Sequence, residues 1–169
     1  FNSNFTIATS VSDGVAAAVT GVKTMTGIAV NDPPVNTVPG AQTVNEDTAL
    51  ALGGISVNDV DGNLNTVQLE VLNGTVTVTL SGTATISAGV NGTTTLTLSG
   101  SQADITTALA SLSYQGTLNY NGPETLTVTS TDTNGVTSID SVAITVTAVN
   151  DAPGLAANTG STVVQGGRD

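Results

Sequence analysis

The sequence predicts an all-β protein, an antiparallel Greek-key β-sandwich of about seven short strands, and three observations indicate this fold class. Threonine alternates with Val, Leu, Ile and Ala in short runs, the pattern of strands with one buried face. Asn-Gly and Asp-Gly turn sequences separate these runs. Aromatic residues make up only 2% of the chain against 38% for all hydrophobic residues, so the core must be aliphatic.

A motif that occurs twice divides the chain into repeats. Val-Asn-Asp-Pro-Pro at 30–34 returns as Val-Asn-Asp-Ala-Pro at 149–153, which is 119 residues later. Such self-similarity is typical of tandem arrays. The expected parts are the C-terminal strands of a preceding repeat at 1–31, one complete repeat at 32–151 and the start of the next repeat at 152–169.

Two strands and a stiff connector are expected before the complete repeat. The alternating run at 5–9 and the run at 19–30 predict strands, with an Asp13-Gly14 turn between them. Three prolines within 31–40 predict an extended connector, because proline fixes the backbone and disfavours a helix.

A short strand at 42–44 and a buried strand at 49–57 begin the complete repeat. Asn-Glu-Asp-Thr at 45–48 predicts a turn between them, because Asn and Asp stabilise turns. The adjacent Gly53 and Gly54 suggest a bulge inside the second strand.

An Asn-Gly pair at 73–74 predicts a β-hairpin. The flanking runs at 67–71 and 76–80 alternate, and Asn-Gly accepts the positive φ angles of a tight turn. A second Asn-Gly pair, at 91–92, precedes another expected strand at 95–98.

One short helical segment, near 102–110, is expected to interrupt the β pattern. Ser101 and Asp104 have the spacing of a helix N-cap, and Ile105, Leu109 and Leu112 share a helical face. The remaining expected elements are strands at 125–130 and 142–149, with a turn at 132–135.

The acidic residues are expected to gather at the two ends of the sandwich. Following the strands at about 3.3 Å per residue places the 58–63 loop and Asp132 beside the incoming linker. The same argument places Glu46 and Asp47 beside the outgoing linker, so seven of the 13 acidic residues lie at the two junctions.

Carboxylates this close repel one another unless a cation joins them, and the chain holds only two basic residues for a net charge of −11. Ca²⁺ suits such loops, because it accepts six to eight oxygen ligands in flexible geometry. Solvated turns are the alternative interpretation. The predicted ligands are Asn31, Asp32, Glu46, Asp47, Asn58, Asp59, Asp61, Asp132, Asn150 and Asp151.

Composition argues against several other classes. The absence of Cys and His removes disulfides, thiolate metal sites and the usual general base. The negative charge disfavours nucleic acid and anionic membrane surfaces, and no apolar run is long enough to cross a bilayer. We expect no enzymatic activity, since linkers cover the carboxylate pairs, and few aromatic side chains are present to bind sugars.

The combination of motifs at 45–48, 59–62 and 149–153 resembles the cadherin-type repeat. It is most similar to the bacterial cadherin-like repeats of giant secreted adhesins. The resemblance implies a cadherin- or Ig-like sandwich at the cell surface or outside the cell. Linker Ca²⁺ would stiffen such an array for adhesion, fibre or biofilm structure. Its partners would be neighbouring repeats, with a surface glycan or protein as a further ligand.

Two other functions are weighed against this spacer. The chain starts and stops inside partial repeats, so identical subunits joined by strand complementation into a non-covalent filament are the first alternative. A carbohydrate-binding module is the second. In addition, Lys23 aligns with the inward position of Val142 at the 119-residue offset. An inward lysine could form an isopeptide bond, but a register shift that leaves it in solvent is the preferred interpretation.

Overall fold

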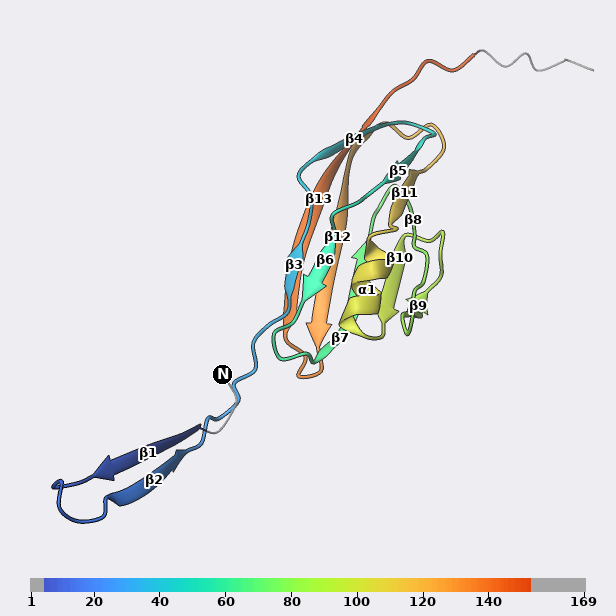
Figure 1. Cartoon of the computed structure of the whole chain (residues 1–169). Helices are drawn as coiled ribbons and strands as arrows, with labels where there is room; N and C mark the ends of the chain where they lie inside the picture. The colour runs from blue at the N-terminus through green and yellow to red at the C-terminus, as the bar shows by residue number, and fades with distance from the viewer. Residues whose placement is uncertain (1–4, 153–169) are drawn as a thin grey trace, which may run out of the picture.

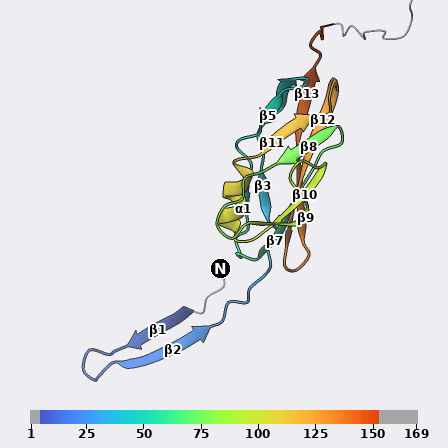
Figure 2. The ribbon, with the colours of Figure 1, turned by 90° about the vertical axis from the view of Figure 1, so that its right-hand side faces the viewer.

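Two layers of β-strands enclose a hydrophobic core between residues 35 and 147, so the predicted all-β sandwich is confirmed. The structure, a computed structural model, describes residues 5–152. One layer is a six-stranded sheet in the order β4 (Gln42–Asn45), β13 (Thr137–Thr147), β12 (Gly122–Asp132), β7 (Leu64–Glu70), β10 (Thr95–Ser99) and β9 (Thr85–Gly89). The opposite layer holds β5 (Ala49–Ala51), β11 (Ser113–Gly116) and β8 (Gly74–Thr77), the pair β3 (Val35–Thr37) and β6 (Ser56–Asn58), and the helix α1 (Gln102–Leu109) (Figures 1 and 2).

Alternating aliphatic side chains fill the space between the layers. On β7, Val67 and Leu69 are completely buried, whereas the neighbouring Glu70 is exposed. Tyr114 on β11 is the largest of the fully buried side chains, and its ring is surrounded by this aliphatic cluster. Each such side chain removed from water contributes about 1.5–3 kcal/mol, so the alternating strands supply the main stabilisation of the sandwich.

The helix begins where the sequence predicts it. The Ser101 side chain accepts a hydrogen bond from the Asp104 backbone N–H at 3.2 Å, which caps the helix. Asp104 in turn accepts from Thr83, from the backbone N–H at 2.9 Å and from the hydroxyl at 2.7 Å. Ile105 and Leu109 are buried against the core, so the helix closes one end of the second layer.

Replacing Asp104 with Asn is expected to lower the unfolding midpoint at neutral pH, with a difference that shrinks in acid. Hydrogen bonds from the Thr83 backbone, the Thr83 hydroxyl and the Ser101 hydroxyl lower the pKa of Asp104 below its usual value. Because the pKa is lower in the folded state, ionised Asp104 stabilises the fold at pH values above the unfolded-state pKa of about 3.9. This stabilisation is lost as the pH falls through the folded-state pKa. Thermal unfolding between pH 7 and pH 3 measures this. An equal difference at every pH would contradict it, and Glu70→Gln on an exposed strand position is the control.

The predicted strand at 49–57 is instead two strands in different sheets. β5 pairs with β11 and β6 pairs with β3, so the chain passes from one sheet to the other between them. Gly54 has φ +84°, a left-handed conformation that glycine adopts without strain. The Gly-Gly pair therefore marks a crossing between sheets, and the prediction of a bulge was wrong.

The predicted hairpin around Asn73-Gly74 is also wrong, because β7 and β8 lie in opposite layers. Neither residue has a positive φ, so no tight turn forms here. Glycine is required at position 74 for a different reason. A Cβ atom there would lie 2.5 Å from the Gln115 carbonyl oxygen and 2.5 Å from the Tyr114 ring. Close approach of β8 to β11 explains this glycine.

The six-stranded sheet brings its first and last strands in chain order, β4 and β13, side by side. β4 runs parallel to β13, from Gln42 opposite Ile144 to Asn45 opposite Thr147, an exception to the expected antiparallel arrangement. The connector before β4 contains β3, which pairs antiparallel with β6. The chain enters the sandwich at one pole and leaves it at the other (Figure 1).

A separate hairpin precedes the sandwich. β1 (Phe5–Val11) and β2 (Val19–Met25) pair antiparallel, as the two predicted strands of a preceding repeat would, although β2 ends at Met25. Every residue of both strands is exposed. In Figure 1 the hairpin, in dark blue, lies beyond the pole where the chain enters. The expected further repeat lies outside the described residues from position 153 onward.

Candidate functional site

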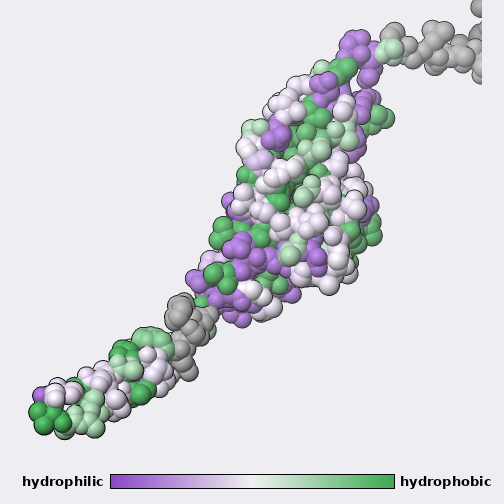
Figure 3. Space-filling model, in the orientation of Figure 1, coloured by the Kyte–Doolittle hydropathy of each residue, from purple (hydrophilic) through white to green (hydrophobic). Residues whose placement is uncertain are grey.

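The loops at the chain's entrance to the sandwich form a polar cluster, which we call the N-terminal pole. It unites the incoming linker, the β6–β7 loop and the β12–β13 turn. Figure 3 shows hydrophilic residues concentrated around this end of the sandwich. The side chains concerned are Asn31, Asp32, Asp59, Asp61, Asn63, Asp132 and Asn134.

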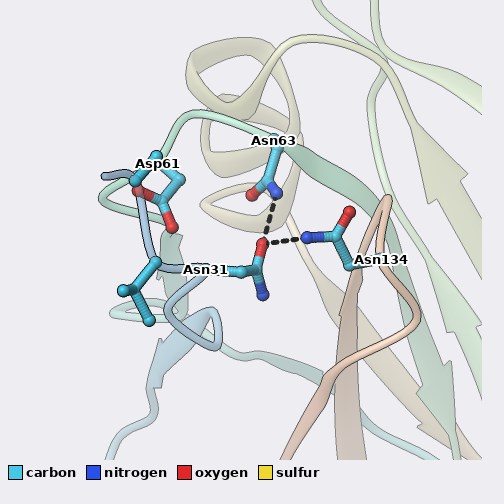
Figure 4. Close-up of a pocket in the computed structure, with 6 residues that line it drawn as sticks. Asn31, Asp61, Asn63 and Asn134 are labelled. Atoms are coloured by element: carbon cyan, nitrogen blue, oxygen red, sulfur yellow. Dashed lines mark hydrogen bonds between the residues drawn. The ribbon is translucent and has the colours of Figure 1, made fainter. Parts of the chain in front are cut away.

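Asn31 connects the linker to both loops. Its side-chain nitrogen donates to Asp132 Oδ2 at 2.7 Å, and its oxygen accepts from the side-chain nitrogen of Asn63 at 2.7 Å and from that of Asn134 (Figure 4). The next linker residue, Asp32, donates its backbone N–H to Asp61 Oδ2 at 2.7 Å. The linker is thus bonded to the β6–β7 loop, about 30 residues away in sequence, and to the β12–β13 turn, about 100 residues away.

Two carboxylates of this pole are buried. Asp132 is completely buried and accepts the backbone N–H groups of Asn134 and Val136, each at 2.8 Å. The hydrogen bond from the Asn31 side chain, with help from these N–H groups, lowers the pKa of Asp132 below its usual value. Asp59 is 4% exposed and accepts the Asp61 backbone N–H at 3.0 Å. Asp132 is therefore held as an anion within the fold.

The Asn63 amide lies between the Asn31 amide and the Asp59 carboxylate. With its nitrogen toward Asn31, its oxygen faces both carboxylate oxygens of Asp59. With the amide reversed, the nitrogen donates to those oxygens at 3.0 and 2.9 Å, but the amide oxygen then lies 2.7 Å from the Asn31 oxygen. The Asn63 amide thus joins the buried Asp59 carboxylate to the Asn31 amide of the linker.

A cavity of about 360 Å³ adjoins this amide. It provides room for an ion together with bound water. The cavity is lined by Ala29, Val30, Asn31, Asp61, Asn63 and Asn134.

The outgoing linker meets a second cluster, the C-terminal pole. Glu46, 7% exposed, accepts the Val149 backbone N–H at 2.6 Å and the Asn121 side-chain nitrogen at 3.2 Å. Asp47 accepts the Asn119 backbone N–H at 2.9 Å. The Asn119 amide, once reversed, donates to Asp47 at 3.3 Å and to Asp151 at 3.1 Å, so its oxygen otherwise faces two carboxylates. Both poles thus place an amide against acidic oxygens.

Most predicted ligands contact the carboxylates or linkers of these two clusters. The side chains of Asn58 and Asn150 make other contacts. Asn58 accepts from the Gln102 side chain at 3.1 Å, which directs its oxygen toward α1. Asn150 donates to the Asp151 carbonyl at 3.2 Å, repeating the bond from Asn31 to the Asp32 carbonyl at 3.4 Å.

Asparagine residues were missed at both poles. Their signal in the sequence is proximity to an acidic residue, since Asn63 follows Asp61 by two positions and Asn134 follows Asp132 by two. Asn119 and Asn121 carry no such signal, because Asp47 and Glu46 are distant in sequence. Within the described range, no three or more His, Cys, Asp or Glu side chains form a group able to hold a metal ion. Amide and backbone oxygens would have to complete a site.

The comparisons with known proteins change the family assignment. Across residues 5–152, no helix is long and apolar enough to cross a membrane. No curated protein matches the chain. Residues 49–141, more than half of the chain, match the family described as the Protein GAMETE EXPRESSED 2 domain.

This match overturns the identification as a bacterial cadherin-like repeat. Two of the three motif segments behind that identification, 45–48 and 149–153, lie outside the matched residues. Short acidic turns suit any sandwich with polar ends, so they did not distinguish one family from another. The chain belongs to the family of the Protein GAMETE EXPRESSED 2 domain.

Proposed function

We propose that this chain is a structural spacer module of an extracellular protein, and that Ca²⁺ at the junctions between repeats stiffens it. The observation that carries the proposal is the burial of two carboxylates, Asp59 and Asp132, beside the incoming linker, where the amide of Asn63 also lies against Asp59. A cation beside Asp59 would take carboxylate and amide oxygens as ligands. At the opposite pole the amide of Asn119 likewise lies against the carboxylates of Asp47 and Asp151.

In this proposal each linker would lie between two sets of calcium ligands. At the outgoing linker, Val149 is held by Glu46 of the domain before it. At the incoming linker, Asn31 and Asp32 are held by Asp132 and Asp61 of the domain after it. Since the two linkers are equivalent at the 119-residue offset, a complete junction would combine both sets. A single repeat carries half a site at each end, which fits the absence of a three-acid group among the described residues.

The proposed chemistry follows from the ligand types. Carboxylate, amide and backbone oxygens are hard ligands, and Ca²⁺ accepts irregular sets of six to eight of them. The net charge of −11, with only two basic residues, makes an external cation the available counter-charge. Binding there would fix the linker against both domains. The family name refers to expression in gametes, and the proposed role of the module does not depend on the cell type.

The test is thermal unfolding with Ca²⁺ and with chelator, on two chains. One is the chain itself, and the other repeats residues 33–151 after Asp151, which creates one complete junction. At free Ca²⁺ 100-fold above Kd, one site stabilises by about 2.7 kcal/mol, or about 5–10 °C in midpoint. We expect the larger rise in the duplicated chain.

Two variants separate specific binding from general screening of charge. Asp61→Asn should remove most of the rise in the duplicated chain, whereas Glu70→Gln, an exposed acid away from both poles, should leave it unchanged. An absent rise in both chains, or an equal rise with Mg²⁺, would contradict the calcium site. The acidic loops would then act as solvated turns.

A further inference from the structure

We propose that the β1–β2 hairpin is the docking surface for the body of a preceding sandwich in the same polypeptide. A strand equivalent to β7 would pair antiparallel with the free edge of β1, and a strand equivalent to β4 would pair parallel with β2. Together they would complete a second sandwich. This inference rests on strand register and does not depend on calcium.

The hairpin has the same register as β12–β13 at the 119-residue offset. Its pairing runs from Phe5 opposite Met25 to Val11 opposite Val19. Adding 119 gives Glu124 opposite Ile144 and Ser130 opposite Ser138, both of which are pairs of the complete sandwich. Agreement over seven successive pairs indicates the same structural element, because a slip by one residue would exchange the faces of a strand.

The turns of the two hairpins agree as well. Asp13 accepts the backbone N–H groups of Val15 and Ala16 at 3.0 and 2.9 Å. Its equivalent, Asp132, accepts the backbone N–H groups of Asn134 and Val136. Both turns thus begin with an Asp that accepts the N–H two residues further on, and they differ only in its second backbone partner.

One face of the hairpin is apolar and exposed where its equivalent is buried. Leu126 and Ile144 of the sandwich are at most 1% exposed. Their equivalents are Ile7 and Met25, which are 45% and 44% exposed. Among the described residues nothing covers this face, and an isolated two-stranded hairpin is at best marginally stable in water. A covering body of the same fold would bury these side chains.

A preceding repeat fits the hairpin better than a second copy does. In each copy, β12–β13 already occupies the place between β7 and β4, so a second copy would have to release its own hairpin. That hairpin has two eleven-residue strands and a fully buried apolar face, whereas β1 and β2 have seven residues each. The polypeptide also leaves β2 toward Asn31 as it leaves β13 toward Asn150. The geometry thus favours a partner within the same polypeptide.

The test adds the strands of a sandwich in front of the β1–β2 hairpin. Residues 33–121 of this chain are placed directly before Ser3, so that the native hairpin follows them as β12–β13 follows them in the sandwich. Hydrogen exchange of residues 5–11 and 19–25 is measured in chelator and compared with the original chain. We expect exchange to slow by about 100-fold in the fused chain. Ile7→Asp, on the apolar face, should abolish the protection, and Ala8→Asp, on the opposite face, should leave it.

Lys23 gives a second, independent variant. Its equivalent is Val142, which is 1% exposed, and the pairing of Lys23 with Ile7 matches that of Val142 with Leu126, so the register shift preferred from the sequence does not occur. An uncompensated lysine at this position would weaken docking on the supplied body. The double variant Thr9→Val/Lys23→Val restores the aliphatic pattern of Val128 and Val142 and should protect the hairpin more strongly. If neither fused chain protects the hairpin, the proposal is overturned. Protection in the original chain that grows with protein concentration would also overturn it, in favour of a second copy.

Discussion

Tyr114→Ala should lower the free energy of unfolding of the sandwich by about 4 kcal/mol, the largest effect expected from a single substitution here. The ring is completely buried among aliphatic side chains, so truncation leaves a large cavity. Its hydroxyl also donates to the Asn73 carbonyl at 2.9 Å. Burial, and then the negative charge of Glu124, raises the pKa of Tyr114 to about 12, so the hydroxyl keeps its proton at any ordinary pH.

Tyr114→Phe separates the ring from the hydroxyl. Removing one hydrogen bond should cost about 1 kcal/mol, and the remainder of the loss in the alanine variant is due to the cavity. Urea unfolding followed by far-ultraviolet circular dichroism measures both. Similar losses for the two variants would show that the hydroxyl, not the ring, holds this region together.

Glu124→Gln should destabilise the sandwich by about 3 kcal/mol, or on the order of 10 °C. The Glu124 side chain is 4% exposed and accepts the backbone N–H groups of Leu72 at 3.3 Å, Thr125 at 2.7 Å and Asn73. Glutamine keeps the shape but turns an NH₂ group toward backbone donors, and buried donors left without an acceptor are costly. The destabilised segment is residues 72–73, where the chain passes from β7 in one layer to β8 in the other.

The matched control is Glu70→Gln, which makes the same chemical change at an exposed position of β7 and should cost less than about 0.5 kcal/mol. A further variant that combines Glu124→Gln with Tyr114→Phe tests coupling. Both groups hold Asn73, so their effects should not be additive. Additive losses would mean that the crossing is held by two independent contacts.

Local patterns in the sequence predicted local structure well. The Ser101 cap and the turn at 45–48 form where the residues indicate. The two final strands also form, but they cover Gly122–Asp132 and Thr137–Thr147 and not the predicted 125–130 and 142–149. Alternation could not show which layer a strand joins, because it marks only a buried and an exposed face. The sequence therefore predicted a tight turn at Asn73-Gly74. In the structure, contacts with Glu124 and Tyr114, about 40–50 residues away, determine the path of the backbone here.

The candidate site was predictable in part for the same reason. Strand direction placed Asp59, Asp61 and Asp132 around the incoming linker, and hydrogen bonds in the structure join the linker to Asp61 and Asp132. Amides such as Asn119 could not be anticipated, because their role depends on contacts between distant loops. Family membership could not be read from the acidic loop motifs, since most of them lie outside the matched residues.

The parallel pairing of β4 with β13 determines how the sandwich would respond to tension. The chain enters at one pole and leaves at the other, so a pull on both ends acts along the strands. The four residue pairs between β4 and β13 are then loaded in shear and must yield together, whereas a hairpin pulled from its open end unzips one pair at a time. The sandwich should therefore resist extension more strongly than its equilibrium stability alone would indicate.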